Sequence, residues 1–347
     1  MMNFKKFSVY FVFVMIVFVA INALVWQLFT SEILTRKQSD IMTGDMSRMG
    51  YLPHLNHERK NSTTLKKKHL NSEQYSGEKV DMITLGDSFS QGNTGGLNRY
   101  YQDYFATYLN MDILNIHELP KSRNYIETIV MLHNSGELKK LKPKYILIES
   151  TQRKVVSRLS MPIDYTTTST NLDYYKKKNN SSFTLPKVSF INNGNFKYLA
   201  YTFLYNFSDR AFISKVHHVK LNQKLFSIQE GDDLLYYNSD IRAIKKHSKE
   251  NLITVNANLN KLALLLKQQD IQLIFMPAVG KYDLYHDYII DNNYAKDPFF
   301  DYLRPLKKDY IFLDTKKILL NEVKNGVKDV FYVDDTHWSY KASDAIA

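Results

Sequence analysis

A long uncharged stretch near the start of the chain, Phe7 to Ser31, constrains the protein most. Within it, residues 7–28 are almost wholly apolar. About 22 residues in a helix rise roughly 33 Å, enough to cross a hydrocarbon core of about 30 Å. Two lysines directly precede the stretch, and basic residues favour the cytoplasmic side of a membrane. We therefore expect residues 1–31 to form a cytoplasmic tip and a single transmembrane anchor embedded in the lipid bilayer, with the rest of the chain outside the cytoplasm.

A cleaved signal peptide is the alternative to an anchor. Its apolar region would be shorter, about 7–15 residues, and would end in a small-x-small site. Ala20 and Ala23 are poorly spaced for such a site, so an uncleaved anchor is favoured. Cysteine is absent, which excludes disulfides, thiolate metal sites and cysteine nucleophiles, and which fits an oxidising compartment. The expected location is the inner (plasma) membrane, with the main domain in the periplasm or an equivalent extracytoplasmic space.

The chain after the anchor divides by its apolar pattern. Residues 32–78 are polar and mixed, so we interpret them as a juxtamembrane stalk. From residue 79 to 347, short apolar runs alternate with stretches of helical spacing, which is typical of an α/β fold with a mainly parallel sheet. Residues 155–248 interrupt the alternation and are too long for a loop, so we expect an insertion that caps the active face. The predicted strands are 80–85, 112–116, 144–149, 271–276 and 310–313, and the predicted helices are 97–109, 125–132, 251–268, 282–290 and 315–323.

The residues directly after the first predicted strand are the strongest candidates for a reaction centre: Gly86, Asp87, Ser88, Phe89 and Ser90. Open parallel sheets bind ligands beyond the carboxyl ends of their strands. A serine at this point lies on a strand-to-helix turn, where the following backbone N–H groups point toward any oxyanion formed there. Gly86 permits the tight turn. Ser88 is therefore the candidate nucleophile, and Gly86, Asp87 and Phe89 are candidates to bind the oxyanion or the substrate.

A serine hydroxyl is a poor nucleophile unless a base takes its proton. The candidate base is His337, which follows the last apolar run of the chain. Strand ends that are far apart in sequence become neighbours in such a sheet, so Ser88 and His337 can meet. Asp334 or Asp335 would fix the tautomer of the imidazole and stabilise the imidazolium. The sequence thus predicts a serine-hydrolase type of site.

Other polar residues after strand ends are candidates for binding the substrate or the oxyanion. Gln152 and Arg153 follow the third predicted strand and are candidate donors to an oxyanion. The alternative for Arg153 is a salt bridge with Glu149. Lys281 and Tyr282 follow the fourth predicted strand, where they either line the pocket or pack against a helix.

The formal charge of +11 is compatible with anionic lipid, anionic glycan or nucleic acid. The lysine runs at residues 66–68 and 176–178 lie in loop-like stretches without a nucleic-acid motif, so we expect solvated surface and no nucleic-acid partner. Four paired histidines have no carboxylate at helical ligand spacing, and we interpret them as surface residues: His54, His57, His217 and His218. No metal and no other cofactor is expected.

At these residues the chain resembles a known family. Gly86-Asp87-Ser88 is similar to the first motif of the SGNH (GDSL) hydrolases, and Asp334-x-x-His337 is similar to their last motif. Asp335-Thr336-His337-Trp338 looks more like the Asp-x-His-Trp motif of the SGNH-like acetyltransferases of bacterial exopolysaccharide modification, typified by alginate O-acetylation. The motif order, serine first and histidine last, is that of the hydrolases and favours Asp334 as the acid, whereas the Asp-x-His spacing favours Asp335. We assign no counterpart in this chain to the Gly and Asn of the SGNH name.

The resemblance covers about residues 80–153 and 250–347 and implies a three-layer α/β/α domain. It implies O-acyl transfer, with acetyl as the expected group, through an ester on Ser88 to hydroxyls of an extracytoplasmic polysaccharide, with Trp338 in the site. Because acetyl-CoA is cytoplasmic, it also implies a multi-pass membrane protein as the acyl donor. A carbohydrate esterase or deacetylase with the same machinery is the alternative. A non-catalytic scaffold that binds glycan or an assembly partner is the second alternative.

Overall fold

The computed structural model describes residues 4–34, 44–53, 61, 63–169 and 188–347. Its central feature is a six-stranded sheet with the order β1-β3-β2-β4-β7-β8, in which every neighbouring pair is parallel. The α/β class and the mainly parallel sheet are therefore confirmed. The strands are β1 (Leu70–Asn71), β2 (Met82–Leu85), β3 (Ile113–Ile116), β4 (Tyr145–Thr151), β7 (Gln272–Ala278) and β8 (Ile311–Phe312).

The strand order reverses between β2 and β4. From β2 the chain goes to β3 on one side, whereas β4, β7 and β8 extend the sheet on the other side. At such a switch point the connections leave the two central strands in opposite directions, and ligands of open α/β sheets bind beyond the carboxyl ends there. The residues that follow Leu85 and Thr151 therefore belong to the most favourable edge of this sheet for a site.

The central strands are apolar on both faces, which is typical of buried parallel strands. Ile146, Leu147 and Ile148 of β4 are all buried, and β2 is buried along its whole length. Two groups of helices pack against the sheet. One group is α4 (Tyr125–Asn134), α6 (Gln152–Leu159) and α9 (Lys249–Lys267), and the other is α3 (Tyr101–Tyr108), α12 (Thr315–Lys324) and α13 (Tyr340–Ile346).

Side-chain caps begin two of the long helices. Asn124 accepts a hydrogen bond from the backbone N–H of Glu127 at the start of α4, and Ser248 accepts one from Asn251 at the start of α9. Each cap satisfies one of the N–H groups that a helix start leaves without an internal partner. The shorter helices are α5 (Glu137–Leu141), α8 (Asn238–Ile244), α10 (Lys281–Tyr285), α11 (Phe299–Leu303), η2 (Ser72–Gln74) and η4 (His286–Tyr288).

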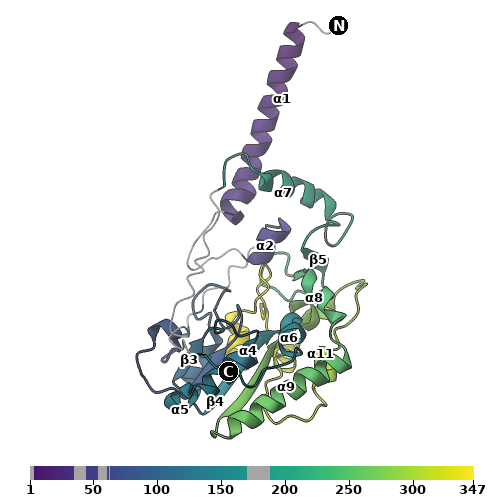
Figure 1. The fold of residues 1–347 in the computed structure, drawn as a ribbon. Helices are drawn as coiled ribbons and strands as arrows, with labels where there is room; N and C mark the ends of the chain where they lie inside the picture. The colour runs from purple at the N-terminus through teal and green to yellow at the C-terminus, as the bar shows by residue number, and fades with distance from the viewer. Residues whose placement is uncertain (1–3, 35–43, 54–60, 62, 170–187) are drawn as a thin grey trace.

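The N-terminal helix α1 (Phe4–Val25) projects from the rest of the molecule and continues through η1 (Trp26–Leu34) in wider, π-type turns (Figure 1). Within the described residues, Phe4–Ser31 is the one helical stretch that is long and apolar enough to cross a membrane. Little of it is buried within the protein, and Ile16 is 62% exposed. So much contiguous apolar surface is unusual on a monomeric soluble protein.

Parts of residues 32–78, expected as a stalk, pack onto the domain. Helix α2 (Asp45–Gly50) lies between the anchor and the α/β domain (Figure 1), where Met46 packs against Val216. Strand β1 adds an edge strand beside β3. The folded domain therefore includes residues that precede the predicted boundary at residue 79.

The described part of the insertion, residues 155–248, contains α7 (Asn193–Leu204), an antiparallel hairpin of β5 (Val216–Lys220) and β6 (Asp233–Tyr237), and α8. The hairpin contacts α2 and α10. Since α10 follows β7, this places the hairpin near the carboxyl edge of the sheet.

His217 on β5 is not a surface residue, so that prediction is wrong. Its Nδ1 lies 2.7 Å from Oδ2 of Asp209, and its ring stacks on Tyr236 with the centroids 4.6 Å apart. The alternation of side chains along a strand turns His217 inward and leaves His218 partly exposed. Of the other predicted surface residues, Lys66 and Lys68 are exposed, whereas His54, His57 and residues 176–178 lie outside the described part of the chain.

Candidate active site

Ser88 lies in a tight turn directly after β2. Gly86 begins this turn, and a side chain does not fit there: a Cβ atom would lie 2.2 Å from Oγ of Ser90 and 2.4 Å from Oε2 of Glu149. The backbone of the turn is thus pressed against the end of β4. This close approach, in addition to the turn itself, requires glycine.

Hydrogen bonds tie the turn to β4. The backbone N–H of Asp87 and the hydroxyl of Ser90 both donate to Oε2 of Glu149, each at 2.9 Å. The Asp87 carboxylate accepts from the backbone N–H of Thr151 at 3.0 Å and from Arg158 at 2.5 Å. Asp87, predicted to bind substrate or the oxyanion, therefore has a different task, because its carboxylate holds the turn in place.

The pKa values of the two acidic side chains below the turn are shifted in opposite directions. Burial and the nearby Asp87 carboxylate raise the pKa of Glu149 well above its ordinary value, which favours its neutral form. Burial also acts to raise the pKa of Asp87, but the charge of Arg158 and the hydrogen bonds to the carboxylate outweigh it, and the pKa of Asp87 is lowered. The Asp87–Arg158 ion pair, with Arg158 partly exposed, thus lies beside an acid whose neutral form is favoured.

Ser88, His337 and Asp335 form a continuous hydrogen-bonded chain. Oγ of Ser88 lies 2.7 Å from Nε2 of His337, and Nδ1 of His337 lies 2.6 Å from Oδ1 of Asp335. Because a carboxylate only accepts, Nδ1 carries the ring proton and Nε2 is left to accept from the serine. The sequence prediction that Ser88 and His337 can meet agrees with this geometry.

The acid beside the imidazole is Asp335 and not Asp334. Asp335 also accepts from the backbone N–H of His337 at 3.0 Å, which fixes the loop conformation. The carboxylate of Asp334 accepts instead from the backbone N–H of Gly44 at 2.7 Å, and its carbonyl accepts from Met46 and Ser47 at the start of α2. The motif-order argument, which favoured Asp334, is therefore wrong, and Asp334 joins α2 to the loop.

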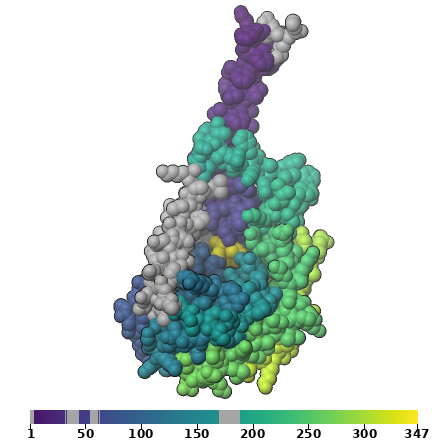
Figure 2. Space-filling model, in the orientation of Figure 1, coloured from purple at the N-terminus to yellow at the C-terminus, as the bar shows by residue number. Residues whose placement is uncertain are grey.

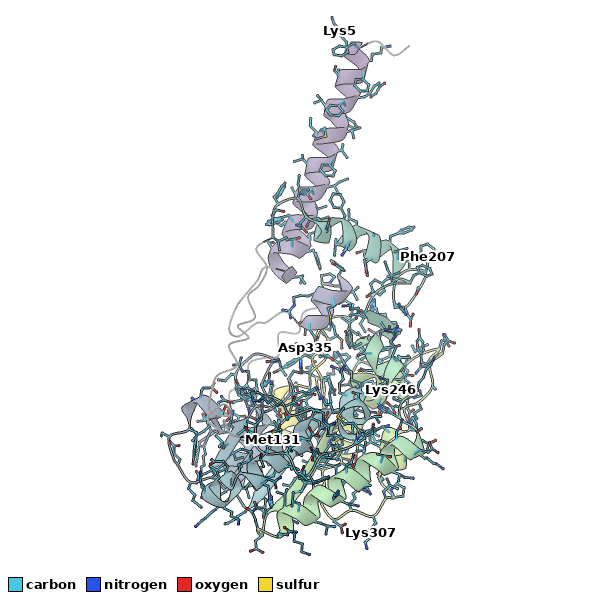
Figure 3. All side chains as sticks on the ribbon, in the orientation of Figure 1. Lys5, Met131, Phe207, Lys246, Lys307 and Asp335 are labelled. Atoms are coloured by element: carbon cyan, nitrogen blue, oxygen red, sulfur yellow. The ribbon has the colours of Figure 1, made fainter. Side chains whose placement is uncertain are left out.

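A third acidic side chain, Asp45, reaches this cluster from α2. Its carboxylate accepts from the backbone N–H of Thr336 at 2.8 Å, and it lies within 4.8 Å of ligand atoms of Asp335 and His337. Burial and the charge of Asp335 raise the pKa of Asp45 to about 6. Figure 3 labels Asp335 just below α2. Sequence reasoning missed Asp45, because nothing in the aperiodic segment around it marks it.

The electrostatic surroundings favour the protonated form of His337. Burial alone would lower its pKa, but the charge and hydrogen bond of Asp335, together with the charge of Asp45, outweigh burial, and the pKa of His337 lies above its ordinary value. An imidazolium that formed on proton transfer from Ser88 would thus face two carboxyl groups.

Asp45, Asp335 and His337 are also a candidate set of metal ligands, because their ligand atoms lie within 4.8 Å of one another. Both ring nitrogens of His337 already have hydrogen-bond partners, Ser88 on one side and Asp335 on the other. An ion would have to displace one of them. The donor set therefore fits proton transfer better than metal binding.

Lys281 is held in the protein interior, whereas Tyr282 borders a small pocket together with Gln152, Arg153 and Asp240. The ammonium of Lys281 is buried and donates to the backbone carbonyls of Tyr332, Val333 and Asp335 at 2.6, 2.8 and 3.2 Å. The hydroxyl of Tyr282 is directed to the carbonyl of Tyr294 at 3.0 Å. Tyr282 therefore packs within the protein and also borders that pocket, so neither predicted alternative alone describes it. Lys281 has a more specific task, because it holds the loop that carries Asp335.

Gln152 and Arg153 lie beside this loop and differ in their hydrogen-bond and ion-pair partners. The amide of Gln152 donates to Asp283 at 2.9 Å and accepts from the backbone N–H of Gly280 at 2.7 Å, so it is not directed at an oxyanion. Arg153 pairs with Asp240 at 3.3 Å. Neither predicted alternative for Arg153 describes this contact, because Glu149 lies under the nucleophile turn.

Arg153 nevertheless remains close to the candidate triad. Its guanidinium lies 3.4 Å from Oγ1 of Thr336, and its charge acts on His337 and Asp45. Among the described residues, no hydrogen-bond acceptor is paired with the backbone N–H of Ser88. This N–H is therefore a candidate donor to a developing negative charge, and Arg153 adds a positive charge beside the loop that carries His337.

Phe89 and Trp338 support the imidazole by packing. The ring of Phe89 lies edge-on to His337, with the centroids 4.8 Å apart, and edge-on to Trp338 at 4.6 Å. Both aromatic side chains are almost completely buried. Their predicted place near the site is correct, but in this structure they contact protein and position His337.

A hydrogen-bonded chain of a serine hydroxyl, an imidazole and a carboxylate is suited to nucleophilic attack by the serine, with the imidazole as general base. The remaining predicted residues arrange the turn and the loop that carry them. No protein-family model, no curated protein and no solved structure matches this chain.

Proposed function

We propose that the protein is an SGNH-like acyltransferase that forms an acyl ester on Ser88. The observation that carries the proposal is the chain of two hydrogen bonds, Ser88 to His337 at 2.7 Å and His337 to Asp335 at 2.6 Å. The parallel sheet with helices packed against it is compatible with the three-layer α/β/α architecture of that family. The motif similarity at Gly86-Asp87-Ser88 and Asp335-Thr336-His337-Trp338 supports the assignment.

In the proposed first step, Oγ of Ser88 attacks the carbonyl carbon of an acyl donor. Nε2 of His337 takes the serine proton as the new C–O bond forms, and Asp335 stabilises the imidazolium. The backbone N–H of Ser88 donates to the developing oxyanion, and Arg153 adds a positive charge beside the loop that carries His337. Collapse of the intermediate expels the leaving group, which takes the proton back from His337, and leaves the acyl ester on Ser88.

In the second step, a hydroxyl group of the acceptor attacks the ester carbonyl, and His337 takes its proton. The acyl C–O bond to Oγ of Ser88 then breaks, and His337 returns the proton to Ser88 as the acylated acceptor leaves. The acceptor in the proposal is an extracytoplasmic polysaccharide, and acetyl is the transferred group. The apolar helix Phe4–Ser31 supports a location at the inner (plasma) membrane, with the catalytic domain in the periplasm or an equivalent space. Because acetyl-CoA is cytoplasmic, the proposal includes a multi-pass membrane protein that supplies the acyl group.

Water in place of the sugar hydroxyl would make the same machinery an esterase or deacetylase. The anchor favours the transferase, because it would keep the domain beside a membrane-bound donor. A scaffold without catalysis is the other alternative, and the engagement of Gln152 with Asp283 and Gly280, which leaves few oxyanion donors, is the observation in its favour.

Labelling with a fluorophosphonate tests the catalytic proposal. We expect the full chain in detergent to be labelled, and the labelling to be lost in Ser88→Ala and His337→Ala. Ser157→Ala is the matched control, because Ser157 is an exposed serine on α6. Equal labelling of wild type and Ser88→Ala, or an inert wild type that is folded by circular dichroism, would overturn the proposal.

Partition of the acyl group separates the transferase from the esterase. The full chain is given an activated acetyl ester and an increasing concentration of an oligosaccharide acceptor. A transferase forms acetylated oligosaccharide while the release of free acetate falls. An acetate yield that does not change with the concentration of the acceptor identifies the esterase.

A further inference from the structure

Helix α7 crosses the end of the apolar anchor helix. The rings of Phe18 and Phe196 are stacked with centroids 5.9 Å apart, and those of Phe29 and Tyr198 are 4.7 Å apart. Figure 1 has α7 running across the lower end of α1, and in Figure 2 the teal segment around α7 covers the base of the anchor on the visible face. The insertion is therefore attached to the anchor as well as to the domain.

A buried polar contact joins the two helices. Asn22, which lies within the apolar stretch of α1, is only 4% exposed. Its amide donates to the carbonyl of Phe190 at 2.9 Å and accepts from the amide of Asn195 at 2.8 Å. Polar groups inside a bilayer need such partners, because lipid tails offer none. The contact thus suits a junction that lies at membrane depth.

Helix α7 exposes its more apolar face, whereas a helix on the surface of a water-soluble protein exposes its more polar face. The face toward the protein carries Tyr198, Tyr201 and Tyr205, all of which are partly buried. The opposite face, here called the α7 face, consists of Leu199 and Phe203, with Phe196 at its edge beside Phe18 and with Phe207 just beyond the end of the helix. These four residues have helical spacing and are all exposed, Phe203 by 63% and Phe207 by 65%. The more apolar face therefore points away from the protein.

Charge is almost absent along this segment. From residue 190 to 208 the one charged residue is Lys197. Beyond the helix, Phe212 and Ile213 are 59% and 70% exposed and extend the apolar surface. Figure 3 labels Phe207, whose side chain lies at the outer margin of the molecule. An apolar surface of this kind, continuous with a membrane helix, fits lipid.

We propose that α7 lies in the plane of the membrane and that the α7 face is inserted into the leaflet on the side of the catalytic domain. The proposal rests on the membrane anchor that forms part of the proposed function. Trp26 lies near the outer end of the apolar stretch, where an interfacial aromatic is expected. Asn22 precedes Trp26 by four residues, a rise of about 6 Å along a helix. Interfacial helices bury their apolar face about 5–10 Å into the boundary between headgroups and acyl chains. The contact of α7 with Asn22 therefore lies at the depth that an interfacial helix takes.

Lipid, rather than a second copy or another protein, is the occupant because of this continuity. The α7 face begins where the lipid-facing surface of α1 ends, and the helix packs crosswise against α1 through Phe18 and Asn22. The anchor and α7 together would fix the orientation of the catalytic domain relative to the membrane surface, which a single helix with a polar linker would leave free.

Depth-dependent quenching tests the proposal, and the absence of cysteine makes single labels simple. Three variants of the full chain, Phe203→Cys, Ile253→Cys and Phe13→Cys, are labelled with an NBD fluorophore and reconstituted in phosphatidylethanolamine and phosphatidylglycerol vesicles. Lipids carrying a nitroxide near the headgroup or deep in the acyl chain are the quenchers. Ile253 on α9 is the matched control, since it is an exposed apolar residue away from the anchor. Phe13 reports on α1 itself.

We expect the label at Phe203 to be quenched several-fold more than the label at Ile253, and more strongly by the shallow nitroxide than by the deep one. Quenching at Phe13 with none at Phe203 overturns the proposal and leaves the anchor intact. Absence of quenching at Phe13 overturns the anchor and the proposal together. A blue-shifted but unquenched label at Phe203 overturns the proposal as well, because it means that a second copy covers the α7 face.

Discussion

The hydroxyl of Ser88 lies 2.7 Å from Nε2 of His337, although 249 positions separate the two residues in the chain. The parallel sheet brings them together, because Ser88 follows β2 and His337 lies in the loop before α13 at the same edge. Lys281 holds that loop through three backbone carbonyls. The relationship therefore depends on the fold and on a small number of buried polar contacts.

Asp335→Asn and Asp334→Asn are expected to differ strongly. Asp335→Asn removes the charge that orients and stabilises the imidazolium, so kcat for an activated acetyl ester should fall by about 100-fold or more. Asp334→Asn should cost much less in kcat, because Asp334 contacts Gly44 and not the imidazole. The two variants are compared by steady-state kinetics on the full chain. The reverse order of losses would contradict the assignment of Asp335 as the acid.

Asp45→Asn is expected to shift the pH profile to lower pH. The neutral form of His337 is the base, and the carboxylates raise its pKa, so kcat/KM should rise with pH through a midpoint above 6.5. Removal of the Asp45 charge destabilises the imidazolium and lowers this midpoint. Asp301→Asn, at a side chain that is 58% exposed, is the control. A midpoint that is unchanged or raised in Asp45→Asn would refute the role given to Asp45.

Glu149→Gln is expected to change how stability depends on pH. Folding raises the pKa of Glu149 above its unfolded value, so the contribution of Glu149 is complete below about pH 4.5 and is lost as the pH rises toward the folded pKa. Glutamine does not titrate. The Tm of the variant relative to wild type should therefore be higher at about pH 8 than at about pH 4. Parallel Tm curves for the two proteins would mean that folding does not raise the pKa of Glu149.

Gly86→Ala is expected to destabilise the protein by about 1–3 kcal/mol, because its Cβ must displace Ser90 and Glu149. The same shift moves Ser88 away from His337 and lowers fluorophosphonate labelling. Gly280→Ala is the matched control, since its Cβ would meet nothing nearer than 3.5 Å. Denaturant unfolding and the labelling rate are measured for both variants. Equal stability and equal labelling rates for the two variants would show that the turn accommodates a Cβ atom at residue 86, contrary to the structure.

The core of the fold was predictable from the sequence. Continuous apolar runs such as Ile146–Ile148 fall in strands, and the spacing of Leu252, Val255 and Leu259 fits the buried face of α9. Patterns of this kind are local, and burial of both faces of a parallel strand leaves a clear signal. The predicted strands and helices therefore agree with the structure to within a few residues at their ends.

Elements that depend on distant contacts were not predictable. Strand β1 has two residues and exists through its pairing with β3, and α2 has six residues that pack against the β5–β6 hairpin and the loop at Asp334. Such short elements have no period of their own. Asp45 was missed for this reason, since it enters the site on α2.

The choice between Asp334 and Asp335 also lay beyond the sequence. Both follow the same apolar run, and neither helical nor strand periodicity applies in a loop. The side-chain directions are set by Lys281 and by the backbone N–H groups of α2, which contact the loop from outside. Position after a strand end identified the candidate residues, and tertiary hydrogen bonds decided the role of each.

Detection of the acyl ester on Ser88 tests the central claim most directly. The full chain is mixed with an activated acetyl ester, quenched in acid within its first turnover, digested and analysed by mass spectrometry. We predict one acetyl group on the peptide that contains Ser88, absent from Ser88→Ala and greatly reduced in His337→Ala. A wild-type chain that turns over the ester with no acetyl on Ser88, or with equal acetylation of that peptide in His337→Ala, would contradict the account.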